Sequence, residues 1–230
     1  MPKRKRLAIF VHGVGSYWNN CQGWSKNLSD PLKKDGWDTK ECIWNDVTEV
    51  DSTPAFNRRF NKPSFWEIRK KITYYFRKFI FDFALDATAY NKYKERLSDY
   101  LYDFYVKHEK EYEDIYIVGY SLGGWISYDF LHKYSPQIPK VRGFLTFGSS
   151  IPLNRLENFT GFHQFPWINF WGTHDVLGMP FKAPLIKDIE YQGNILLFSD
   201  TALSHFEYTR SNRFSRLFRN TINNMFNMPV

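Results

Sequence analysis

The pentapeptide GYSLG, residues 119–123, constrains the fold of this chain more than any other feature of its sequence. It follows the apolar run at 115–118 and precedes residues 122–134, where apolar side chains recur at helical spacing. Glycines on both sides of a serine let a strand and a helix approach each other closely at a sharp turn. The segment therefore predicts a strand, a tight turn and a helix in direct succession.

Short apolar runs alternate with helical segments along most of the chain. Strands separated by helices pair in parallel through right-handed crossovers. The sequence therefore predicts an α/β fold with a doubly wound, mostly parallel sheet, and with functional residues at the carboxyl ends of its strands. Without a linker or repeat to divide residues 1–230, we expect a single domain. We predict strands at 7–12, 39–44, 115–119, 141–147, 167–171 and 194–198, and helices at 22–34, 122–134 and 211–226.

Residues 45–113 interrupt this alternation, and 51–113 carry no convincing strand pattern. Two helical patterns lie within them, at 64–89 and 92–110, and Ser64 and Glu67 have the spacing of a capping box. One side of the first pattern is rich in phenylalanine and isoleucine, and the other is basic. We expect a helical insertion that either packs on the sheet with its lysines in solvent or lies over a pocket or a phospholipid surface as a lid.

Composition limits the compartment and the partners that we expect. The 43% of hydrophobic residues indicates a folded globular protein. With two cysteines, Cys21 and Cys42, and an apolar run too short for a signal peptide after the basic start, the chain is expected to be cytoplasmic. The net charge of +7 favours an anionic partner such as a membrane surface. The sequence carries no recognised nucleic-acid-binding motif, so we do not expect nucleic acid.

Ser121 can be an ordinary turn serine, and the pentapeptide alone fits that interpretation equally well. A serine hydroxyl becomes a nucleophile when a histidine removes its proton and a carboxylate orients the histidine. His205 follows the strand predicted at 194–198, and Asp175 follows the strand predicted at 167–171. Both residues are expected in loops at the same edge of the sheet as Ser121.

Other residues compete for these two roles. Asp200 also precedes His205, but it lies five residues away on the same strand exit, from which it reaches the imidazole less easily. His174 beside Asp175 suggests a metal pair, but no third ligand follows at a recognisable spacing. His108 and His132 lie on predicted helices, where we expect surface or packing residues, and His163 lies in a predicted loop with no partner in view.

A second glycine-rich turn follows the first predicted strand, in the sequence HGVG at 12–15. Backbone N–H groups at such a turn can stabilise the negative charge that develops on an acyl oxygen. The alternatives are a turn that binds nothing and a phosphate cradle. The pattern matches neither common nucleotide-binding motif, which disfavours the cradle.

In their order along the chain, HGVG at 12–15, GYSLGG at 119–124, Asp175 and His205 resemble the serine esterases and lipases of the α/β-hydrolase fold. The resemblance extends over nearly the whole chain and implies hydrolysis of carboxylic esters without a cofactor. The same machinery serves thioesters and amides. A catalytically silent module that binds lipid or a protein partner is the alternative from another class.

The resemblance also implies a role for each matching residue. Ser121 would be the nucleophile, His205 the general base and acid, and Asp175 the carboxylate that orients His205. The backbone amides of Val14 and Leu122 would form the oxyanion hole. Activity should then rise through roughly pH 6 to 8 as an imidazole base loses its proton.

Residues 45–113 match no motif of the resembled family, so they bear on substrate choice only through their composition. Aromatic side chains are frequent at 56–83. We expect this segment to shape an apolar acyl pocket, which favours lipophilic esters as substrates.

Overall fold

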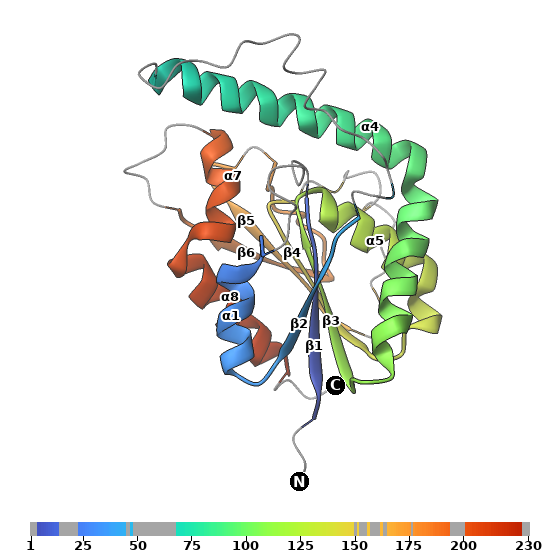
Figure 1. Ribbon diagram of the computed structural model, residues 1–230. Helices are drawn as coiled ribbons and strands as arrows, with labels where there is room; N and C mark the ends of the chain where they lie inside the picture. The colour runs from blue at the N-terminus through green and yellow to red at the C-terminus, as the bar shows by residue number, and fades with distance from the viewer. Residues whose placement is uncertain are drawn as a thin grey trace.

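The computed structural model describes residues 4–13, 23–44, 47, 68–149, 151, 156, 162, 165–175, 177–193 and 201–226. Six strands within these residues form one parallel sheet in the order β2-β1-β3-β4-β5-β6 (Figure 1). The predicted α/β fold with a parallel sheet is confirmed. The strands are β1 Arg6–Val11, β2 Asp38–Cys42, β3 Asp114–Tyr120, β4 Val141–Phe147, β5 Trp167–Gly172 and β6 Ile186–Tyr191.

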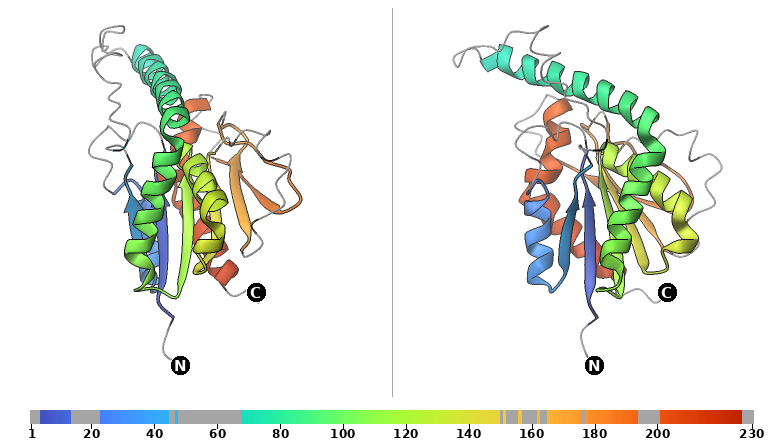
Figure 2. Two further views of the ribbon diagram at one scale, coloured as in Figure 1. Left: turned by 90° about the vertical axis from the view of Figure 1, so that its right-hand side faces the viewer. Right: turned by 45° about the vertical axis from the view of Figure 1, so that its right-hand side comes forward.

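Helices cover both faces of the sheet, as Figures 1 and 2 show. Helices α4 and α5 lie on one face, and α1, α7 and α8 lie on the other. The short 3-10 helix η1, Ser135–Gln137, follows α5 directly. The helices are α1 Lys26–Lys34, α4 Ile68–Glu109, α5 Leu122–Tyr134, α7 Thr201–Arg210 and α8 Asn212–Phe226.

The central strand β3 shows why the sheet is buried on both sides. Ile115 and Ile117 pack into the core beneath α4 and α5, whereas Tyr116 and Val118 pack into the core beneath α1 and α8. Side chains alternate between the faces of a strand, so a continuous apolar run fits a parallel sheet with helices on both sides. By the same alternation, Tyr120 at the end of β3 belongs to the core that includes α7 and α8.

Two predicted helices between 64 and 110 are one helix in the structure. Helix α4 runs without a break from Ile68 to Glu109, so the predicted division near residue 90 was wrong. No glycine or proline occurs in this stretch, so the sequence encodes no helix end there. Figure 1 shows that α4 packs beside α5 and then bends, so that its N-terminal part extends above the carboxyl ends of the strands.

The other boundaries follow the sequence closely, but η1, β6 and α7 were not predicted. Helix 122–134 and strand 141–147 have the predicted bounds. Strand β6 was not predicted, because polar side chains between Ile186 and Tyr191 hide an edge strand. The strand predicted at 194–198 lies outside the described residues. Across the described part of the chain, no helix has an apolar stretch that could cross a lipid bilayer.

Candidate active site

Ser121 occupies a strained turn between β3 and α5. Its backbone φ of 54° and ψ of −124° lie in a region that residues other than glycine rarely adopt. A Cβ atom on Gly119 would lie 2.6 Å from the Gly124 Cα, and one on Gly123 would lie 2.2 Å from the Val11 carbonyl oxygen. Strand and helix therefore meet so closely that only glycine fits on either side of the serine, as the pentapeptide predicts.

The turn after β1 lies directly against this serine. A Cβ atom on Gly13 would lie 2.5 Å from the Ser121 Cβ and 3.1 Å from its Oγ. Leu122 is the first residue of α5, where backbone N–H groups have no acceptor within the helix. Val14, the other expected oxyanion donor, lies outside the described residues, so its role stays a prediction.

His12 holds this turn in place through a buried contact with Trp44. Its Nδ1 lies 2.7 Å from the Gly13 carbonyl oxygen, and its Nε2 accepts a hydrogen bond from the Trp44 backbone N–H at 3.2 Å. The indole of Trp44 donates to the His12 carbonyl oxygen at 2.9 Å, and the two rings stack with centroids 4.8 Å apart. Burial lowers the pKa of His12 to about 4. The imidazole is therefore neutral near pH 7, with its Nδ1 as the donor.

His205 and Asp175 form a buried pair at the carboxyl edge of the sheet. The His205 Nδ1 lies 3.0 Å from both carboxylate oxygens of Asp175, and the Leu177 N–H donates to Asp175 Oδ1 at 2.9 Å. Burial opposes ionisation of Asp175, but His205 and the amides of Leu177 and Gly178 outweigh it and hold the pKa of the carboxyl below its usual range. An ionised Asp175 places the proton on Nδ1 and leaves Nε2 as a base.

His205 lies on helix α7, which corrects the expectation that it lies in a loop. A ten-residue helix is too short to be stable alone and depends on tertiary packing, so its sequence carries a weak signal. Tyr208, one turn further along α7, supplies that packing from the core against β4.

The ends of several elements bring Ser121 and the His205–Asp175 pair into one region. The Ser121 N–H donates to the Phe147 carbonyl oxygen at 3.1 Å, and a Cβ on the next residue, Gly148, would lie 2.9 Å from His205 Cε1. Ser121 and His205 are only 2% and 1% exposed. Within the described residues, the Ser121 hydroxyl has no hydrogen-bond partner. The arrangement supplies a hydroxyl, an oriented imidazole and a carboxylate in a buried environment.

The competing candidates lie elsewhere or outside the described residues. Asp200 and His163 lie outside them. His174 is exposed beside Asp175, and His108 on α4 packs edge-on against Phe104. The sequence analysis did not predict that the His12 ring packs on Trp44 or that Gly148 lies against His205. The only signals for these contacts are the sequences HG at 12–13 and FGS at 147–149.

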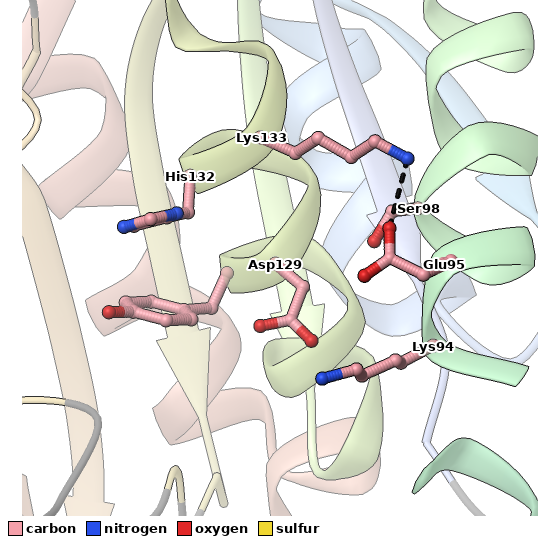
Figure 3. Close-up of a pocket in the computed structure, with 7 residues that line it drawn as sticks. Lys94, Glu95, Ser98, Asp129, His132 and Lys133 are labelled. Atoms are coloured by element: carbon pink, nitrogen blue, oxygen red, sulfur yellow. Dashed lines mark hydrogen bonds and ion pairs between the residues drawn. The ribbon is translucent and has the colours of Figure 1, made fainter. Parts of the chain in front are cut away.

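A polar groove of about 510 Å³ lies between α4 and α5, away from this region (Figure 3). Lys133 crosses it to Glu95, with an Nζ to Oε2 distance of 3.0 Å. Its charged lining differs from the apolar acyl pocket expected for a lipophilic ester. The lining residues are Lys94, Glu95, Ser98, Tyr128, Asp129, His132 and Lys133.

Comparison with solved structures shows that the chain has the α/β-hydrolase fold. A protein from Thermoplasma acidophilum, described as a predicted CIB-like hydrolase, matches with a TM-score of 0.54 over 97% of this chain and 88% of its own, at 14% identity. A protein of unknown function from Agrobacterium tumefaciens, described as a candidate α/β hydrolase, matches with a TM-score of 0.50, 98% and 88% coverage, and 14% identity. No protein-family model and no curated protein sequence matches the chain.

Proposed function

We propose that this protein is a serine hydrolase that cleaves carboxylic esters through an acyl-enzyme. The observation that carries the proposal is the buried His205–Asp175 pair, with 3.0 Å contacts, beside a serine held on a strained strand-to-helix turn. The α/β-hydrolase fold supports it, because in this fold a serine on such a turn faces residues from later strands.

In the proposed reaction the Ser121 Oγ attacks the ester carbonyl carbon while its proton passes to the His205 Nε2. The ionised Asp175 stabilises the imidazolium that forms. The imidazolium then protonates the leaving alkoxide, and the C–O bond to the alcohol breaks. Water, deprotonated by the same imidazole, releases the acid and restores Ser121. The Leu122 amide, with that of Val14, is the proposed donor to the oxyanion.

The proposed substrates are lipophilic acyl esters. Aromatic residues at 56–83 support this choice of substrate. The net charge of +7 supports a second part of the proposal, which is contact with an anionic membrane surface. A panel of p-nitrophenyl esters of increasing chain length tests it. Rates that fall steadily from the acetate onward would contradict a preference for long acyl chains.

Fluorophosphonate labelling of the purified protein, followed by intact mass, tests the mechanism. One adduct is expected on the wild type and none on Ser121→Ala or His205→Ala. His132→Ala, which changes an exposed histidine on α5, is the matched control and should label like the wild type. A folded wild type that does not label would contradict the proposal and favour a silent binding module. Parallel assays with thioesters and amides then define the bond that is cleaved.

A further inference from the structure

Tyr120 is the residue next to Ser121, and its side chain points to the helix that carries His205. It is the last residue of β3, and strand alternation places it in the core with Tyr208 of α7 and Phe214 of α8. Figure 1 shows α7 beside the carboxyl ends of the strands on this same face. Tyr120, the second residue of the GYSLG pentapeptide, therefore faces the helix that carries His205 rather than solvent.

Two separate contacts join Tyr120 to His205. Their rings stack with centroids 5.0 Å apart and planes inclined by 23°. In addition, the Tyr120 hydroxyl donates a buried hydrogen bond to the backbone carbonyl oxygen of His205 at 2.9 Å. One side chain thus contacts both the imidazole and the backbone of the helix that carries it.

The Tyr120 ring is itself held by aromatic neighbours. Trp24 stacks on it with centroids 5.6 Å apart, and Phe147 at the end of β4 stacks at 5.0 Å. Burial, with the charge of Asp175, raises the pKa of Tyr120 well above its usual value, so the hydroxyl stays protonated and remains a donor. The contact surface offered to His205 is rigid.

A rigid face against the imidazole supplies what Asp175 does not. The carboxylate holds one edge of the imidazole at Nδ1. The stacked Tyr120 ring covers one face of the imidazole and opposes tilting of that face. An aromatic face also attracts a cation, and the proposed reaction turns His205 into an imidazolium.

We propose that Tyr120 is a positioning residue for His205, with the ring orienting the imidazole and the hydroxyl anchoring the α7 backbone. This inference rests on the proposed function, in which His205 is the base. Within the part of the chain that the structure describes, the titratable side chains of Asp175 and Tyr208 also contact His205.

Rates of fluorophosphonate labelling, measured from pH 5 to 9, test the two contacts separately. Tyr120→Phe keeps the stack and should lower the rate about 3- to 10-fold without moving the pH profile. Tyr120→Leu also removes the aromatic face. It should lower the rate about 30- to 300-fold and shift the acid limb of the profile to lower pH, because the imidazolium loses its cation–π support.

The matched controls are Tyr116→Phe and Tyr116→Leu. Tyr116 lies on the same strand and the same face, is also buried, and packs edge-on against Trp37. These variants should keep the wild-type rate and pH profile even where the melting temperature falls. A Tyr120 pair that behaves like the Tyr116 pair would overturn the inference and leave the proposed function intact.

A wild type that is folded but does not label would overturn both proposals together. If Tyr120→Leu does not fold, the labelling rates of Tyr120→Phe and Tyr116→Phe are compared instead. This comparison tests only the hydrogen bond from the Tyr120 hydroxyl to the His205 carbonyl oxygen. Equal rates for those two variants would then contradict the inference.

Discussion

Two buried histidines near the carboxyl edge of the sheet have opposite surroundings. His12 contacts backbone groups of Gly13 and Trp44, and burial lowers its pKa to about 4. His205 is equally buried but contacts the carboxylate of Asp175. Burial disfavours the charged form of His12, and its ring contacts only backbone groups that hold the turn. The His205 ring instead contacts a carboxylate that orients it through Nδ1.

The largest expected effect is the loss of ester turnover when His205, rather than His12, is replaced. His205→Asn should reduce ester turnover by about 10⁴- to 10⁶-fold, because it removes the proposed base for the serine proton. Ser121→Ala should have an effect of the same size, because it removes the nucleophile. The melting temperature should stay near that of the wild type. Steady-state rates on p-nitrophenyl butyrate, with circular dichroism as the check on folding, measure this. A loss of less than about tenfold in His205→Asn would show that the base lies elsewhere.

Replacement of His12 should have its main effect on stability. His12→Ala leaves the buried Trp44 N–H without its acceptor and opens a cavity beside the indole, which should cost about 2–4 kcal/mol of unfolding free energy. Urea unfolding at pH 7 measures it. A cost below about 1 kcal/mol would mean that the stacked pair does not hold the turn.

The lowered pKa of His12 should also make the stability of the protein depend on pH. Its pKa is about 4 in the folded protein and 6.5 for an ordinary histidine, so the unfolded chain binds the proton more readily between these values. The stabilisation from a neutral His12 is complete above pH 6.5 and is lost as the pH falls toward 4. It amounts to about 3 kcal/mol.

Comparison of the wild type with His12→Asn isolates this contribution, since the variant lacks the titrating group but keeps a polar side chain. Unfolding free energies at pH 7 and pH 4.5 should differ more in the wild type than in the variant. The same pH dependence in both proteins would argue that His12 is protonated in the folded state.

The smallest effect tests one hydrogen bond of the stacked pair. Trp44→Phe keeps an aromatic ring on His12 but removes the indole N–H that donates to the His12 carbonyl oxygen. It should cost about 1 kcal/mol of stability with little change in turnover. A large loss of turnover would instead show that this bond orients the turn for catalysis.

The strand-to-helix turn around Ser121 could be predicted because its causes are local. Two glycines and a helical run specify a close approach, and the structure has the predicted bounds for α5. The order of the elements likewise predicted the parallel sheet. The helical form of α7 and the edge strand β6 could not be predicted, since both depend on packing against the sheet rather than on a pattern of their own.

The sequence by itself determined the fold class, the turn that bears Ser121 and the order in which Asp175 and His205 follow it. Only the tertiary structure decided that His205 lies on a helix, that it pairs with Asp175 and that Tyr120 stacks on its ring. The physical reason is distance along the chain: these contacts join residues 30 and 85 positions apart. Local propensity specifies no such contact, and only the order of strands and the packing of helices on them bring the partners together.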